Sequence, residues 1–249
     1  MTGSILSYLD GYCERAGDGA IFAEPLNAVT NLFFIVAAVM AARALLQCAR
    51  DRHPELGSGS ISAATIAQTR DAMDSRLRGN DRMMDLWLLI AALFSIGIGS
   101  GLWHLHPTGT TVLMDVIPIT LFINIYLLSA MRRLFMFGWR RTLCWFGLYW
   151  MMTVAAQIYL PPDLLHGTIM YIPTYVAMVA ITYGISRRDW ALGKIFALVT
   201  TVWSASLILR TVDLEICQAF PIGTHFLWHT LNAWVLWRLL MVLLERGDR

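Results

Sequence analysis

Charged residues are scarce in this chain: Asp, Glu, Lys and Arg make up only 14% of its 249 residues, whereas 57% are hydrophobic. So few charges exclude an ordinary soluble domain. Lys occurs once, and the Arg residues lie in polar connections without forming a basic patch, which excludes nucleic-acid binding. The first 20 residues are polar and lack a long apolar stretch, so we expect no cleaved secretory signal.

Long apolar runs are abundant instead. A bilayer core about 30 Å thick needs roughly 20 apolar residues per helix. The sequence therefore predicts an all-α, polytopic membrane protein with one domain, residues 1–249, built as a seven-transmembrane-helix bundle. Residues 50–82 are rich in Ser, Gly, Arg and Asp and are expected to form a flexible cytoplasmic loop or an insertion. The seven expected spans are 26–47, 84–104, 111–131, 142–160, 166–185, 193–210 and 222–244.

Basic residues gather in alternate connections between these spans. Only Arg15 and Arg210 fall in the other connections. Because Arg and Lys favour the cytoplasmic side, the N-terminus is expected outside and the C-terminus in the cytoplasm. The residues on the predicted cytoplasmic side are Arg50, Arg52, Arg70, Arg76, Arg78, Arg82, Arg132, Arg133, Arg140, Arg141, Arg187, Arg188, Lys194, Arg246 and Arg249.

With this orientation, the unusual polar side chains of the expected spans all lie in the outer half of the membrane. Ionisable side chains are costly in a bilayer and usually mark a functional site. We therefore expect one polar site near the outer face, formed by the ends of the first, second, third and seventh spans. Its members are Glu24, Asn27, Asn31, Ser100, His104, Asp115, His225 and His229.

The histidines of this group predict a zinc site. His225 and His229 are four residues apart, so a helix places them on one face. His104 lies at a matching depth in the second span and is the expected third ligand, with His106 as the alternative. Three His fill three positions of a tetrahedral zinc site and leave the fourth for water, whose pKa zinc lowers to about 7.

Ser100 and Asp115 are expected beside this site. Ser100 shares a helix face with His104, and a short turn containing Pro and Gly brings the helix of Asp115 alongside. We predict that Asp115 holds and deprotonates the water, and that Ser100 hydrogen-bonds the oxyanion of an attacked carbonyl. Two plainer roles stay open: Asp115 as a charge that stabilises a helix N-terminus, and Ser100 as a small residue that permits close helix packing.

The outer N-terminal segment carries a group of acidic residues. Asp10, Glu14, Asp18 and Glu24 offer the oxygen ligands that calcium prefers. The alternative is an acidic outer segment without a bound metal ion.

The outer connections also contain two of the four cysteines, Cys13 and Cys217. Because the outer side is oxidising, we predict a disulfide between them. Near Cys217, Arg210 and Asp213 are expected to form a surface ion pair of little energetic value. The cysteines expected to stay free are Cys48 and Cys144.

Four stretches keep their order and spacing along nearly the whole chain: Tyr12-Cys-Glu-Arg with Ala23-Glu-Pro-Leu-Asn-Ala-Val-Thr-Asn-Leu; Ser100-Gly-Leu-Trp-His104; Asp115, eleven residues after His104; and His225-Phe-Leu-Trp-His229. Together they resemble the alkaline ceramidases in their bacterial branch, within a wider group of seven-helix membrane hydrolases. Gly11 and Ala16 depart from the eukaryotic pattern, which has Asp and Asn there.

The resemblance implies a zinc amidase that cuts the N-acyl bond of ceramide or a related N-acyl lipid and releases a sphingoid base, or another amine, and a fatty acid. It implies His104, His225 and His229 as zinc ligands, Ser100 and Asp115 as assisting residues, and a calcium site in the N-terminal segment that includes Glu14 and Glu24.

The expected partner is therefore a lipid substrate taken from the bilayer, and the expected location is the bacterial inner membrane, with the site near the periplasmic leaflet. The oligomeric state does not follow from the sequence. The main alternative is a receptor-like or hemolysin-like seven-helix zinc protein of the progestin and adipoQ receptor type. A zinc or proton transporter is less favoured because the inner half offers few polar groups beyond Asn124 and Thr153.

Overall fold

The computed structural model describes residues 12–15, 22, 24–51 and 65–246, and of residues 65–82 it describes the backbone alone. This part of the chain is helical and contains no strand. The elements are η2 (Cys13–Arg15), α2 (Pro25–Thr30), α3 (Leu32–Asp51), α4 (Thr65–Leu105), α5 (Gly109–Arg133), α6 (Trp139–Tyr159), η3 (Thr168–Tyr171), α7 (Ile172–Ser186), α8 (Trp190–Val212), η4 (Leu214–Ile216) and α9 (His225–Arg246).

Six segments in the described part are long and apolar enough to cross a membrane, which confirms the prediction of an all-α, multi-pass membrane protein. The helix α6 covers the expected fourth span with 21 residues, but it is less apolar than the others and is not among the six. The count of seven spans therefore stays a prediction. The six segments are Pro25–Asp51, Met83–Leu105, Gly109–Arg133, Thr168–Ser186, Trp190–Val212 and His225–Arg246.

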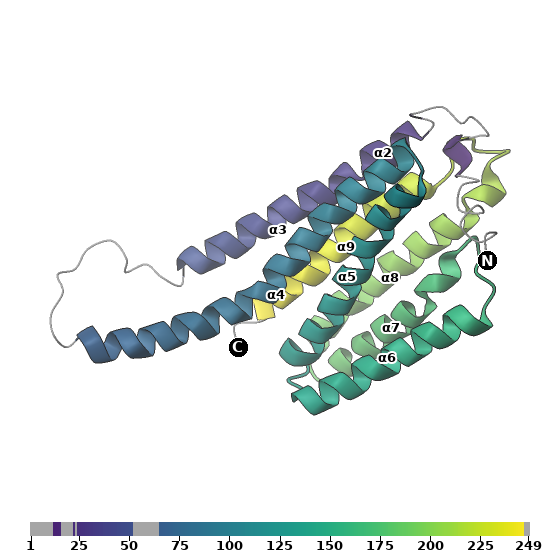
Figure 1. Ribbon diagram of the computed structural model, residues 1–249. Helices are drawn as coiled ribbons and strands as arrows, with labels where there is room; N and C mark the ends of the chain where they lie inside the picture. Colours follow the sequence, from purple (N-terminus) through teal and green to yellow (C-terminus); the bar gives the residue numbers. More distant parts are fainter. Residues whose placement is uncertain (1–11, 16–21, 23, 52–64, 247–249) are drawn as a thin grey trace.

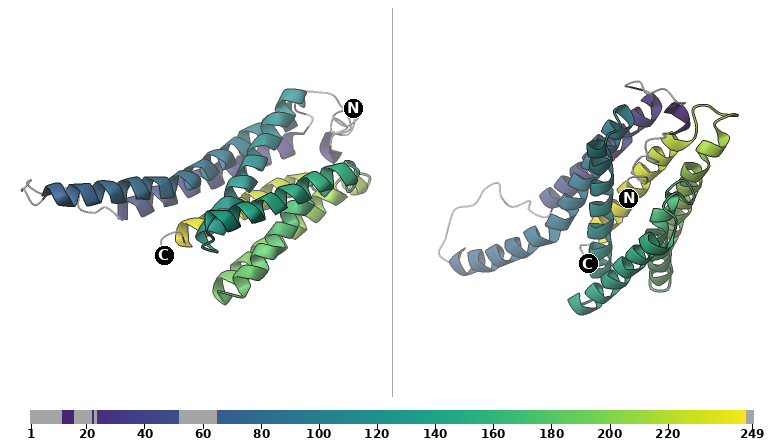
Figure 2. Two further views of the ribbon diagram at one scale, coloured as in Figure 1. Left: turned by 60° about the horizontal axis from the view of Figure 1, so that its bottom comes forward. Right: turned by 45° about the vertical axis from the view of Figure 1, so that its right-hand side comes forward.

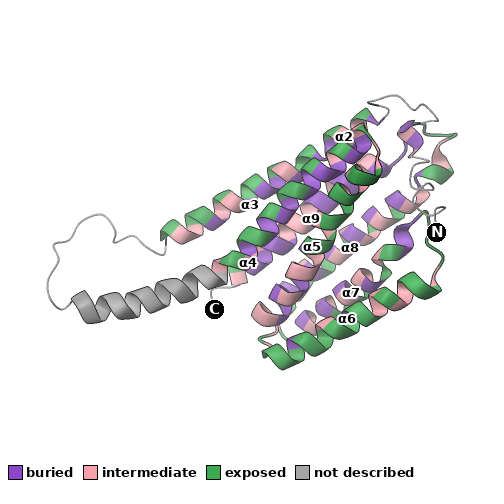
Figure 3. Cartoon of the chain, in the orientation of Figure 1, coloured by how far each residue is buried: buried purple, intermediate pink, exposed green. Residues whose placement is uncertain are grey.

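The helices form one bundle in which α9 is central. It packs against α2, α3, α4, α5 and α8, whereas α6 packs against α5 and α7 at the periphery. The right-hand view of Figure 2 shows α9 (yellow) between the α2–α5 group and the α6–α8 group. Figure 3 shows that α6 is largely exposed, whereas buried residues are frequent on α4 and α9.

The helix α4 begins earlier than the sequence interpretation expected. Residues 65–82, taken for part of a flexible loop, form helical turns that continue into the apolar span, and Figure 1 shows them extending past the end of the bundle. This stretch contains Ala, Gln, Met, Leu and Arg, which favour helix, and it lacks Pro. Residues 52–64 of the expected loop lie outside the described residues.

The two ends of the bundle differ in chemistry. At one end lie ion pairs of Arg133 with Asp85 (2.5 Å) and Arg246 with Asp189 (3.1 Å). At the other end lie the C-terminus of the α4 helix and the N-termini of α5 and α9, so the three helix ends that carry the predicted site residues meet there. The orientation of these ends in a membrane stays a prediction.

Candidate metal centre

Three histidines meet at one point of the bundle. His104 lies in the last turn of α4, and His225 and His229 lie in the first turns of α9. All three are buried, and one ring nitrogen from each lies within 4.8 Å of those of the other two. The predicted trio is thus brought together, and it could hold a metal ion.

The hydrogen bonds around two of the rings define which nitrogen is free to bind a metal. The Thr30 hydroxyl donates to the carbonyl oxygen of Leu26 (2.8 Å), so its oxygen accepts the Nδ1–H of His229 (3.1 Å). The Glu24 carboxylate accepts the Nδ1–H of His104. Each ring therefore turns an unprotonated Nε2 toward the other. Partners of this kind orient the histidine ligands of metal sites.

The two Nε2 atoms are 3.2 Å apart. Two unprotonated nitrogens cannot hydrogen-bond to each other, and they repel at this distance unless a cation lies between them. Two nitrogen ligands about 2.0–2.1 Å from a tetrahedral ion are separated by about 3.3 Å. In addition, the buried Nδ1 of His225 finds no hydrogen-bond partner among the described residues. The donor set therefore fits a metal ion.

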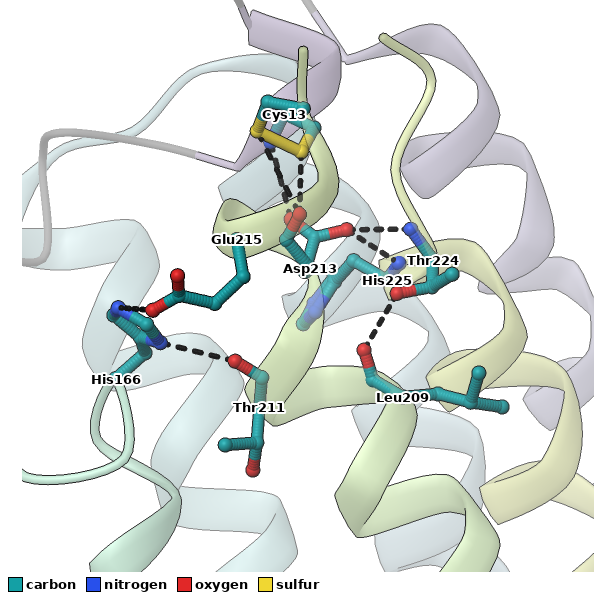
Figure 4. Close-up of a disulfide and its surroundings, with 9 residues drawn as sticks. Cys13, His166, Leu209, Thr211, Asp213, Glu215, Thr224 and His225 are labelled. Atoms are coloured by element: carbon teal, nitrogen blue, oxygen red, sulfur yellow. Dashed lines mark hydrogen bonds and ion pairs between the residues drawn. A yellow bond between two sulfur atoms is a disulfide. The ribbon is translucent and has the colours of Figure 1, made fainter. Parts of the chain in front are cut away.

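Asp213 fixes the start of the helix that carries two of the histidines. One of its carboxylate oxygens accepts the backbone N–H groups of Thr224 (2.6 Å) and His225 (2.9 Å), and the other accepts the N–H of Cys13 (3.1 Å) (Figure 4). Gly223 has a φ of 69°, and a Cβ there would lie 2.2 Å from the Asp213 carboxylate. Only Gly fits this approach to α9.

The sequence interpretation of Asp213 was wrong. We expected Arg210 and Asp213 to form a surface pair, but both are buried, at 8% and 1% exposure. Arg210 binds the carbonyl oxygen of His166 and the hydroxyl of Thr168, each at 2.9 Å. The groups that Asp213 binds are 11, 12 and 200 residues away in sequence, so no local pattern indicates its role.

Replacing Asp213 with Ala should destabilise the protein, because three buried backbone N–H groups lose a charged acceptor. The expected cost is about 2–3 kcal/mol, or roughly 5–10 °C in the midpoint of thermal unfolding. Glu215→Ala is the matched control, since that carboxylate lies in the same connection but is 70% exposed. Equal midpoints for the two variants in detergent solution would contradict the assigned role.

The predicted disulfide is confirmed. Cys13 and Cys217 are bonded, with their Cα atoms 5.1 Å apart, and Cys48 and Cys144 are free. The bond fastens η2 to the connection before α9 (Figure 4). The ring of the neighbouring Tyr12 stacks on His225, with 3.6 Å between ring centroids, and lies 5.2 Å from the ring of His104. Burial raises the pKa of the Tyr12 hydroxyl, which is neutral at physiological pH.

Ser100 and Asp115 lie in one cavity with His229, one member of the trio. The hydroxyl of Ser100 faces the carboxylate of Asp115 across the interface of α4 and α5. The approach of the two helices depends on Gly99, where a Cβ would lie 1.8 Å from the carbonyl oxygen of Met114. Oδ1 of Asp115 is buried and finds no hydrogen-bond partner among the described residues. An acceptor is thus available in the cavity that His229 also lines.

The cavity extends from these residues into the bundle. Its wall is mainly apolar, and part of it is open to the surroundings. On α5 it reaches from Asp115 to Leu127, which corresponds to about 18 Å along a helix. The shape therefore suits a ligand with a polar head, near Ser100 and Asp115, and a long apolar tail along α5.

Glu14 and Glu24, the two described carboxylates of the predicted calcium site, both contact groups of the protein itself, and calcium binding stays a prediction. The two oxygens of Glu14 accept the backbone N–H groups of Leu26 (2.6 Å) and Asn27 (2.8 Å) at the start of α2. The buried Glu24 binds Arg15, His104 and the Asn27 side chain. Burial raises the pKa of both carboxyls; the two N–H groups oppose the rise at Glu14 and Arg15 opposes it at Glu24. Asp10 and Asp18 lie outside the described residues.

The other histidines do not belong to the trio. His106, the alternative third ligand, is exposed beyond the end of α4. His166 is exposed and donates its Nδ1–H to the carbonyl oxygen of Thr211 (2.9 Å). His53 lies outside the described residues.

No known protein family and no curated protein matches this chain. The assignment of a function therefore depends on the arrangement of its own residues.

Proposed function

We propose that the chain is an intramembrane zinc-dependent amide hydrolase of the alkaline ceramidase type. Its substrate would be ceramide or a related N-acyl lipid, and its products a sphingoid base, or another amine, and a fatty acid. The observation that carries this proposal is the meeting of three buried histidines, an unpartnered carboxylate oxygen and a serine hydroxyl at the head of a long apolar cavity.

In this proposal His104, His225 and His229 hold the zinc ion. When bound, zinc supplies a Lewis acid that polarises the amide carbonyl and makes a water molecule acidic at neutral pH. The nitrogens not used for binding in His104 and His229 stay hydrogen-bonded to Glu24 and Thr30, so the rings cannot rotate away.

Asp115 and Ser100 carry out the proton transfer and the charge stabilisation. The carboxylate of Asp115 takes a proton from the attacking water as the new C–O bond forms, and it gives that proton to the amide nitrogen as the C–N bond breaks. The hydroxyl of Ser100 donates a hydrogen bond to the carbonyl oxygen, which becomes negatively charged in between. Proton and charge are balanced at the end, with an amine and a carboxylic acid as products.

The cavity supports a substrate with a long hydrocarbon chain. Its apolar wall comes from α5, α7 and α9 and removes the chain from water, with a favourable free energy of about 25 cal/mol per Å² of apolar surface. Tyr12 covers the trio from the outer end of the bundle, so we propose that the lipid arrives sideways from the bilayer, between α5 and α7.

We further propose that the site faces the periplasmic leaflet of a bacterial inner membrane, with the C-terminus in the cytoplasm. The Arg residues at the opposite end of the bundle and the disulfide at this end support that orientation, because disulfides form in oxidising compartments. A C-terminal reporter that is active only outside the cytoplasm would contradict it.

The experiment that tests the activity uses purified protein and a panel of N-acyl lipids, with and without a zinc chelator. We expect release of fatty acid and free amine from ceramide or from another member of the panel, detected by mass spectrometry, and we expect the chelator to stop it. Saturable lipid binding and bound zinc without any product would instead favour the receptor-like alternative.

A further inference from the structure

Tyr12 and the three residues of η2 each contact a different group elsewhere in the protein. Tyr12 stacks on His225 of α9, Cys13 is bonded to Cys217, Glu14 binds the N-terminus of α2, and Arg15 pairs with Glu24. Tyr12 contacts one candidate metal ligand directly, and Arg15 is linked to another, His104, through Glu24.

Glu24 needs a cation. Its side chain is 0% exposed, and a buried carboxylate without a counter-charge is strongly destabilising. Oε1 of Glu24 pairs with the Arg15 guanidinium, which is itself only 8% exposed. Because a guanidinium stays charged in proteins, this counter-charge is permanent and does not depend on the concentration of any ion.

The other oxygen of Glu24 faces the histidine trio. Oε2 accepts the Nδ1–H of His104 and the side-chain N–H of Asn27 (3.1 Å). A continuous chain of contacts therefore runs from Arg15 through Glu24 to His104, whose Nε2 faces that of His229. The orientation of this ligand depends on the charge of Glu24, and hence on Arg15.

The carboxylate oxygens that a calcium ion would need are already in contact with groups of the protein. Calcium takes six to eight oxygen ligands. The Glu14 oxygens are both directed at backbone N–H groups, and those of Glu24 are directed at Arg15 and His104. A divalent cation next to Glu24 would also meet the positive charge of the guanidinium.

We propose that Arg15 is the built-in cation of this segment: it takes the place that a calcium ion would need at Glu24, and it positions His104 so that the metal centre forms without calcium. This inference concerns metal binding and stability. It holds whether or not the bound metal serves amide hydrolysis.

The test compares the wild-type protein with Arg15→Gln and Arg15→Lys, and uses Arg43→Gln, at an exposed position of α3, as the control. Zinc and calcium contents are measured by mass spectrometry after equilibration with graded chelator. Thermal unfolding is followed with added calcium or with a calcium chelator. For wild type we expect no stoichiometric calcium and the same midpoint under both conditions.

For Arg15→Gln we expect zinc affinity to fall by about 10–100-fold, as for the loss of other groups that orient a metal ligand. Arg15→Lys should recover part of this loss, because it restores the charge but not the planar geometry. If Arg15→Gln folds poorly, the double variant Arg15→Gln/Glu24→Gln should unfold at a higher temperature than Arg15→Gln, since it leaves no unpaired buried charge.

Two results would overturn the inference. One is a wild-type protein that retains stoichiometric calcium or gains stability when calcium is added. The other is an Arg15→Gln variant that binds zinc as tightly as Arg43→Gln does. Neither result depends on finding a substrate, so failure here is distinguishable from failure of the proposed hydrolase activity.

Discussion

Replacing His225 with Ala is expected to abolish zinc binding and lipid hydrolysis together. The variant keeps only His104 and His229 near the metal position, and a zinc ion with two protein ligands is held far more weakly than one with three. The backbone N–H of residue 225 still donates to Asp213, so the start of α9 is preserved. The variant should therefore lose its zinc while it retains its fold.

The measurement is zinc per chain and product formation for the same purified sample. His106→Ala is the matched control, because that His is exposed two residues beyond His104 and does not belong to the trio. It should retain zinc and activity at the wild-type level. A His225→Ala protein with bound zinc and full turnover would show that this trio is not the metal site.

Replacing Asp115 with Asn is expected to separate metal binding from chemistry. Asn has nearly the same shape and can still accept a hydrogen bond from Ser100, but it cannot take up a proton. We expect hydrolysis to fall by about 10²–10⁴-fold, the usual contribution of a general base, while zinc content stays unchanged.

Asp163→Asn is the control for this second variant, since Asp163 is an exposed carboxylate in the connection after α6. Product release is followed by mass spectrometry over long incubations so that a small residual rate is measurable. An Asp115→Asn protein that hydrolyses lipid at the wild-type rate would leave the alternative role of Asp115, a charge favourable to the N-terminal part of α5.

The histidine trio was predictable because two simple constraints define it. The spacing of His225 and His229 fixes a shared helix face, and the length of apolar segments places His104 at the same depth. The same reasoning placed Cys13 and Cys217 on one side and led to the disulfide that the structure contains. Helix periodicity and the length of the apolar segments are local features of the sequence, and they are sufficient to place these residues relative to one another.

Contacts between distant, irregular segments were not predictable in the same way. Asp213 binds the start of α9 across a connection whose path depends on Gly223, and Arg15 meets Glu24 only because η2 folds back over α2. The acidic composition of the N-terminal segment suggested calcium ligands. The contacts that Glu14 and Glu24 make with protein groups depend on side-chain directions, which composition does not give. The extended start of α4 was missed because a polar stretch was equated with a loop.

X-ray absorption at the zinc edge, on purified protein, tests the central claim most directly. We expect one tightly held zinc ion with three imidazole nitrogens at about 2.0–2.1 Å and one further oxygen ligand. We also expect the imidazole signal to be lost in His225→Ala and kept in His106→Ala. A protein that retains no zinc, or whose zinc shows no imidazole ligands, would contradict the central claim.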